Sequence, residues 1–328
     1  MNKKKCPNCG SPITKRNGKR KGVQLYKCQA CGRQFRTGEK LSDERLWYLY
    51  QERKQTIAEI AQDYGVSEST IKRQLRHICI EWKQPKLNGM SGYVHLDATY
   101  WGHNWGVLLA LDEAQTKPLY VAFIKSERTE DYLLAVNTII KNGYQIRGVI
   151  LDGKISVFNA LAQIPRQMCH FHIKQIIIRK LTKNPKIKAS IALLALIDRL
   201  PKITQADFKI AYNKWQIEYE DTIKRRSETK EGSTHYTHRK LRGAMKSINT
   251  FLPYLFTYQR SDCKGMPNTN NKIEGVFTDL CKNLNNHSGL IEKNRKRFIN
   301  ALTLFFLALE DKSANQNSSE SKPTAATP

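Results

Sequence analysis

Two cysteine pairs near the start of the sequence have the spacing of a metal site. Cys6 and Cys9 form one CxxC motif, and Cys28 and Cys31 form a second one 18 residues further on. Each CxxC turn can direct two thiolates at one ion, and this layout is typical of tetrahedral zinc sites. Residues 1–40 have little apolar content, so structural Zn²⁺ would supply folding free energy that this segment lacks. A redox dithiol and unrelated cysteines are the alternatives.

Acidic residues close two apolar runs further along the chain. Asp97 ends the run YVHLD, and Asp152 ends GVILD. Ionised carboxylates at the ends of strands lie at the rim of a sheet, where they can meet water or metal. Asp112 is a competing strand-end acid, and with 29 acidic residues in the chain a chance pair is the plain alternative.

A third acid, Glu274 in TNNKIEG, opens a late helix and could lie beside the two aspartates. Three converging carboxylates repel each other unless a cation compensates, so the cluster predicts Mg²⁺ or Mn²⁺. Two such ions can activate a water or a DNA 3′ hydroxyl in phosphodiester transfer.

The charge balance points to nucleic acid as the partner. The chain has 55 Lys and Arg against 29 Asp and Glu, a formal net charge of +26. Such an excess calls for a polyanion or an acidic surface. Several basic residues crowd the cysteine pairs and would attract phosphates without reading sequence, among them Lys15, Arg16, Lys19 and Arg20.

Residues 56–77 have the pattern of a helix-turn-helix. A short helix is followed by a turn at Gly65 and a second helix capped by Ser67, which with Thr70 three residues later forms half of a capping box. The positions predicted to be buried are Ile57, Ala61, Val66, Ile71 and Leu75. The second helix carries the side chains predicted to meet DNA, Lys72, Arg73 and Arg76. An ordinary helical hairpin with a solvated basic face is the alternative.

The rest of the chain predicts a mixed α/β layer fold. Apolar runs rich in β-branched and aromatic residues predict strands at 93–96, 107–111, 119–124 and 149–151, with a short fifth at 167–170. Helical periodicity falls at 130–141 and 171–181. From there to about 256 the chain reads as helical with no clear strand, and a final helix spans 270–309 with a break near 287–289.

These patterns divide the chain into consecutive parts. We expect a zinc ribbon at 1–40, a helix-turn-helix domain at 41–83, a linker at 84–92, an α/β domain at 93–310, and a disordered tail at 311–328.

The order of these motifs resembles the Mutator-like group of DDE transposases, including members from bacterial insertion sequences. The resemblance spans roughly residues 93–305 and rests on Asp97, Asp152, CHFH at 169–172 and NNKIEG at 270–275. It implies that residues 93–310 form a ribonuclease H-like catalytic domain with a helical insertion at about 182–266, and that the catalytic acids are Asp97, Asp152 and Glu274.

The group's signature of a Cys and, three positions on, a His falls on Cys169 and His172. Its role is open between a buried structural pair and a contact to metal or DNA. The catalytic core looks compact for the group, because only about 100 residues separate His172 from Glu274.

We therefore expect a transposase that binds the terminal repeats of its element and a target DNA, and cleaves and joins strands with a divalent metal. Synapsis of two DNA ends favours a homodimer or a larger oligomer. No long apolar run is present, so we expect a cytoplasmic protein without a membrane partner. The resemblance implies a bacterial protein that is associated with the nucleoid when bound to DNA. A non-catalytic DNA-binding regulator is the alternative.

Overall fold

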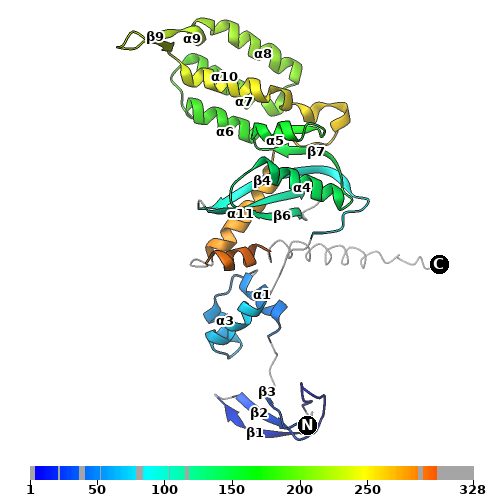
Figure 1. Ribbon diagram of the computed structural model, residues 1–328. Helices are drawn as coiled ribbons and strands as arrows, with labels where there is room; N and C mark the ends of the chain where they lie inside the picture. The colour runs from blue at the N-terminus through cyan, green and yellow to red at the C-terminus, as the bar shows by residue number, and fades with distance from the viewer. Residues whose placement is uncertain are drawn as a thin grey trace, which may run out of the picture. The chain divides into compact units, whose positions relative to one another are not determined.

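The computed structural model describes residues 4–20, 23–36, 41–51, 53–78, 84–102, 104–114, 118–286 and 291–300. The chain divides into two compact units, Met1–Cys79 and Ile80–Pro328, which are described separately (Figure 1). The predicted tail at 311–328 and the predicted helix break at 287–289 lie outside the described residues.

Unit 1 contains a small antiparallel sheet and a group of short helices. The sheet has the order β1-β2-β3, formed by Thr14–Arg20, Val23–Cys28 and Gln34–Arg36. The helices are α1 (Asp43–Gln51), α2 (Ile57–Asp63) and α3 (Glu68–His77).

Local hydrogen bonds define the ends of α2 and α3. Thr56 and Glu59 form a complete capping box at the start of α2, which the sequence analysis did not identify. Gly65 takes a φ of +59° in the turn between the helices, a conformation that glycine adopts without steric cost. Ser67 Oγ accepts from the Thr70 backbone N–H at 3.3 Å, which is the predicted half of a capping box.

The predicted core of this helix pair is partly correct. Ala61 and Ile71 are buried, but Ile57, Val66 and Leu75 are only half-buried. Ile60, one turn after the start of α2, takes the fully buried position instead.

Unit 2 is built on a five-stranded mixed sheet with the order β6-β5-β4-β7-β8. The strand β4 pairs antiparallel with β5 and parallel with β7; β5 pairs antiparallel with β6, and β7 pairs parallel with β8. The strands are β4 (Ser91–Trp101), β5 (Trp105–Asp112), β6 (Pro118–Ile124), β7 (Gln145–Leu151) and β8 (Arg166–Met168). The predicted α/β class is therefore confirmed, although β4 is much longer than expected.

The length of β4 corrects the predicted position of Asp97. This residue does not end the strand: β4 continues to Trp101 because residues 94–101 all pair with β5. The parallel partner β7 stops at Leu151, however, and its pairing with β4 reaches only from Ser91 to His95. Asp97 therefore lies in mid-strand, just past the end of the neighbouring strand, and Asp152 directly follows that end as predicted.

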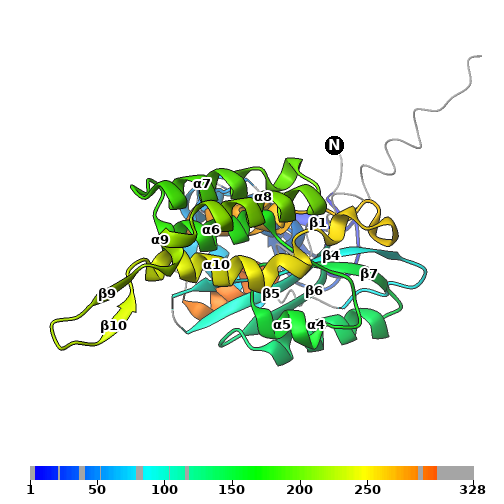
Figure 2. The ribbon, with the colours of Figure 1, turned by 90° about the horizontal axis from the view of Figure 1, so that it is seen from above.

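Helices pack around the sheet and form a separate group beyond it. The helix α4 (Thr129–Lys141) contacts β5, β6 and α5 (Ile155–Ala160), and α11 (Asn271–Asn286) contacts β4 and β5. Between them the chain forms α6 (His170–Leu181), α7 (Lys188–Asp198), α8 (Gln205–Glu218), α9 (Glu220–Lys224) and α10 (Arg239–Phe251). Figure 2 shows these helices as one group.

Two details of this region differ from the prediction. The stretch that was expected to lack strands contains a short hairpin, β9 (Arg226–Glu228) and β10 (Thr234–Tyr236), which projects from the helices (Figure 2). The expected linker at 84–92 is partly integrated into unit 2, because Leu87 is 3% exposed in its core and Ser91 already begins β4.

Short 3₁₀ helices occupy Leu200–Lys202, Leu252–Tyr254, Thr257–Gln259 and Ser261–Cys263, and residues 292–300 are helical.

Within the part of the chain that the structure describes, no helix combines the length and the apolar character needed to cross a membrane.

Asp112, the competing strand-end acid, serves the fold. It pairs with Val94 near the start of β4, whereas Asp97 pairs with Leu109. The Asp112 carboxylate is buried, and it accepts hydrogen bonds from the Tyr144 hydroxyl and from the Ala114 backbone N–H. A buried carboxylate needs such donors, so Asp112 is a structural acid.

We predict that Tyr144→Phe destabilises unit 2 by about 1–3 kcal/mol, because the buried Asp112 loses a donor that water cannot replace. Urea unfolding measures the change. Tyr236→Phe is the matched control, since the Tyr236 hydroxyl makes no hydrogen bond within the described residues and its ring contacts are retained. Equal unfolding midpoints for the two variants would contradict the prediction.

Candidate functional site

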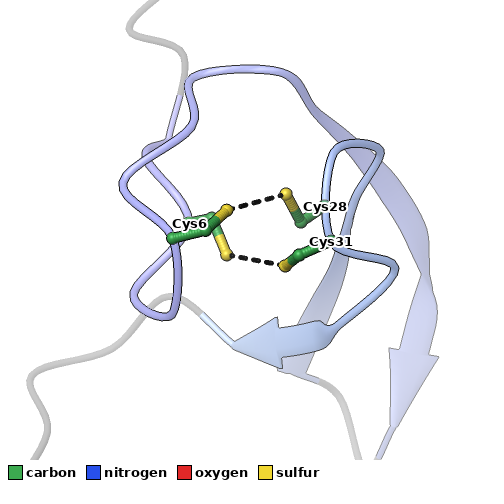
Figure 3. A group of neighbouring side chains, drawn as sticks. Cys6, Cys28 and Cys31 are labelled. Atoms are coloured by element: carbon green, nitrogen blue, oxygen red, sulfur yellow. Dashed lines mark hydrogen bonds between the residues drawn. The ribbon is translucent and has the colours of Figure 1, made fainter.

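The four cysteines of unit 1 converge on one point. Their Sγ atoms lie within 4.8 Å of one another, with 3.7 Å between Cys6 and Cys31 and 3.6 Å between Cys9 and Cys28. Figure 3 shows Cys6 facing Cys28 and Cys31 across this point. Four sulfurs at about 2.3 Å from a tetrahedral Zn²⁺ would be roughly 3.8 Å apart, so the spacing fits zinc.

Two glycines shape the backbone around these sulfurs. Gly10 and Gly32 take φ values of +70° and +72°, and their N–H groups donate to the carbonyl oxygens of Cys6 and Cys28. A hydrogen bond from the backbone of Arg33 is the main cause that lowers the pKa of Cys31 to about 6, whereas hydrogen bonds with the other thiols raise the pKa of Cys9 to about 12. The case for a metal therefore rests on the positions of the sulfurs. The predicted four-cysteine group could therefore hold zinc.

The basic residues predicted to meet DNA lie on the surface of unit 1. Lys15, Arg16, Lys19 and Arg20 are exposed along β1, and Lys72, Arg73 and Arg76 are exposed on α3. Lys72 is paired with Glu68 at 3.0 Å, one turn earlier on the same helix. Exposed pairs of this kind contribute little stability, so the ammonium group remains available to a phosphate.

A second cluster forms in unit 2. Ligand atoms of Asp97, His172 and Glu274 lie within 4.8 Å of one another. These residues come from the middle of β4, the first turn of α6 and the first turn of α11. Two of the three predicted acids are thus brought together directly, and a histidine that the sequence analysis left without a settled role joins them.

The predicted acid Asp152 acts on this cluster through its charge. Asp97 is only 7% exposed, and burial is the main cause that raises its pKa well above the usual value. The charge of Asp152 is the second cause, ahead of the raising effect of Glu274. A hydrogen bond from the Ala98 backbone N–H at 2.8 Å opposes the shift. The cluster is therefore electrostatically strained without a cation.

A fourth acid near the cluster, Glu127, was not predicted from the sequence. Its charge also raises the pKa of Asp97, after the effects of burial, Asp152 and Glu274. The Tyr132 hydroxyl donates to its carboxylate at 2.9 Å, and the Lys154 ammonium lies 3.7 Å from it. Glu127 follows the end of β6 by three residues, so the search for acids at strand ends could have found it.

Two lysines near these acids in the sequence make their contacts within unit 2. The Lys154 ammonium donates to the backbone oxygen of Glu127, and the Lys272 ammonium donates to that of Glu113. Both lysines therefore tie loops near the acidic cluster in place.

The acidic cluster fits a hard divalent cation. Opposite ligands of an octahedral Mg²⁺ are roughly 4.2 Å apart, close to the spread of the three ligand atoms. The raised pKa of Asp97 marks a carboxylate whose negative charge is uncompensated, and a cation would relieve this. Asp97 and Glu274 could hold Mg²⁺ or Mn²⁺, and His172 reaches the same point. Asp152 is not part of this group, so its predicted share in metal binding stays a prediction.

Comparison of the chain with protein-family models finds no match, and no curated protein sequence matches it either.

We predict that Cys9→Ser lowers the zinc content from about one ion per chain to near zero, because one of the four thiolates is lost. Metal analysis of the purified protein measures this. Cys281→Ser on α11 is the control and should keep its zinc. Retention of a full zinc equivalent by the Cys9 variant would show that the ion is held elsewhere.

We also predict that Asp97→Asn makes the metal-free protein more stable at alkaline pH. The raised pKa means that Asp97 ionises less easily in the folded than in the unfolded chain. Ionisation therefore favours unfolding, and the wild type loses stability as pH rises above the ordinary aspartate value toward the folded pKa. Asparagine does not titrate.

The difference between the two unfolding midpoints should widen as pH rises, and Mg²⁺ should reduce it by stabilising the wild type alone. Midpoints measured from pH 5 to 9 in chelator test this. A wild type that is more stable than the variant at pH 9 would contradict it.

Proposed function

We propose that this protein is a metal-dependent transposase of the DDE type, with Asp97, Asp152 and Glu274 as its catalytic acids. The observation that carries the proposal is the convergence of Asp97 and Glu274, which are far apart in the sequence, beside the charge of Asp152. Burial and mutual repulsion make this arrangement costly, so a structural role does not account for it.

The topology supports a ribonuclease H-like core for unit 2. Three antiparallel strands, β4 to β6, are followed by α4 and by two strands added in parallel on the other side of β4. Asp97 on the central strand and Asp152 after its parallel neighbour are the positions that the resemblance to Mutator-like transposases assigns to the first two acids. The helices α7 to α10 would be the insertion that precedes the third.

The chemistry follows from the donor set. Bound divalent ions would supply an activated water or 3′ hydroxyl and stabilise the leaving oxygen in phosphodiester transfer. Asp97, Asp152 and Glu274 would hold these ions. Glu127 would take no part in this task, because Lys154 lies 3.7 Å from its carboxylate and would compensate its charge.

Unit 1 supplies the proposed DNA-binding part. Its four-cysteine group would order a segment that carries exposed basic residues, and α3 would present Arg73 and its neighbours to the major groove. The net charge of +26 supports a polyanionic partner. We propose that this part binds the terminal repeats of a mobile element and that a homodimer or larger oligomer pairs two ends.

We predict that Asp97→Asn and Asp152→Asn each reduce DNA cleavage at least about 1,000-fold, because a metal ligand is lost, while the Kd for DNA changes less than about threefold. The assay incubates the protein with the DNA that flanks its own gene, with and without Mg²⁺. Asp198→Asn is the control, since Asp198 is exposed and pairs with Lys174 on the surface.

Cleavage that persists in both variants would rule out this active site. Mg²⁺-independent DNA binding without any cleavage by the wild type would favour the alternative, a DNA-binding regulator whose α/β unit only dimerises.

A further inference from the structure

Cys169 and His172 both contact the segment that carries Glu274. Cys169 is the N-cap of α6, and its buried Sγ accepts the backbone N–H of Asn270 at 3.2 Å. One turn later, His172 Nε2 lies 3.1 Å from Glu274 Oε1. The two residues therefore connect the start of α6 to the start of α11 at two separate points.

Asn270 is the anchor of this connection. It is 0% exposed, and its backbone oxygen accepts from the Glu274 N–H at 3.2 Å, in the first turn of α11. Its side-chain Oδ1 lies 2.7 Å from His95 Nδ1 on β4, two residues before Asp97. His95 Nε2 in turn lies 2.5 Å from Glu113 Oε2. Through its side chain and its backbone, the buried Asn270 thus links β4, α6 and α11, which carry Asp97, His172 and Glu274.

The hydrogen bonds of His172 distinguish a metal ligand from a positioning residue. A histidine that binds metal through one nitrogen usually donates its other N–H to a carboxylate, a carbonyl or water. His172 Nδ1 is buried and has no hydrogen-bond partner within the described residues. An Nδ1–H there would be an unsatisfied buried donor, so the proton belongs on Nε2, where it can be donated to Glu274.

We propose that Cys169 and His172 are positioning residues that hold Glu274 in place, and we call Cys169, His172 and Asn270 the α6–α11 clamp. Cys169 fixes the backbone at the start of α11, and His172 orients the carboxylate itself. The proposal rests on the proposed function, because Glu274 is taken as a metal ligand. On this proposal, Cys169 and His172 have the same role, which is to position Glu274.

The test compares two amides at position 172. The glutamine amide nitrogen reaches about as far as histidine Nε2, whereas the asparagine amide reaches only as far as Nδ1. His172→Asn should weaken Mn²⁺ binding about tenfold or more, as loss of a residue that orients a ligand does. His172→Gln should stay within about threefold of the wild type, because it retains the donor to Glu274.

A second pair of variants tests the contact between Cys169 and Asn270. Cys169→Ala removes the acceptor of the Asn270 N–H and should weaken Mn²⁺ binding. Cys169→Ser keeps an acceptor at this position and should retain most of the wild-type affinity. Mn²⁺ affinity is measured by electron paramagnetic resonance on the full-length, zinc-loaded protein, with Asp97→Asn as the baseline. Urea unfolding of each variant identifies any loss of fold, which the serine and glutamine variants should not show.

Three results would overturn the clamp: unchanged Mn²⁺ affinity in His172→Asn and Cys169→Ala, equal losses in His172→Asn and His172→Gln, or no Mn²⁺ binding by the wild type above the Asp97→Asn baseline. Equal losses at position 172 would identify the imidazole as a metal ligand. The measurement needs no DNA cleavage, so a wild type whose Mn²⁺ affinity depends on the clamp but which does not cut DNA would refute the proposed function alone.

Discussion

The repulsion between carboxylates around Asp97 is the constraint on which the arrangement of unit 2 depends. Burial already opposes the ionisation of Asp97, and the charges of Asp152, Glu274 and Glu127 oppose it further. An unfolded chain would separate these groups, so the surrounding elements must hold them together in the folded protein. The sheet and the start of α11 are the parts that do so.

The sheet helps to hold the acids together because its neighbouring strands β4 and β7 differ in length. The long strand β4 is paired with β5 along its whole second half, which keeps Asp97 rigid. The shorter β7 ends before it reaches the level of Asp97, so its pairing with β4 stops at His95, two residues before the aspartate. Asp112 on β5 lies opposite the start of β4, where the Tyr144 hydroxyl donates a hydrogen bond to its carboxylate. Asp112 therefore stabilises the fold, whereas Asp97 on the paired strand belongs to the acidic cluster.

The two candidate metal centres are built in different ways. The four cysteines lie within 26 residues of chain, and two glycine-terminated turns are enough to direct their sulfurs at one point. The acidic cluster joins β4 to a helix that begins at Asn271, and it needs the sheet, α6 and the buried Asn270 to be assembled first. The first site can order its own segment, whereas the second depends on a finished fold.

Much of the protein was determined by its sequence alone. The cysteine spacing, the α2–α3 pair with its turn at Gly65, the mixed α/β class and the placement of Asp152 after a strand all followed from local patterns. These features depend on neighbours within about ten to twenty residues, where hydrophobic period, capping and turn residues act directly.

Only the tertiary structure decided the rest. The mid-strand position of Asp97 depends on how far β5 and β7 each pair with β4, which no period in β4 itself encodes. The separation of Asp112 from Asp97, the approach of Glu127 and the contacts of Cys169 and His172 with the start of α11 likewise depend on which elements pack together. A sequence pattern states that a residue is buried, but the partner that it meets there is set by the packing of the whole unit.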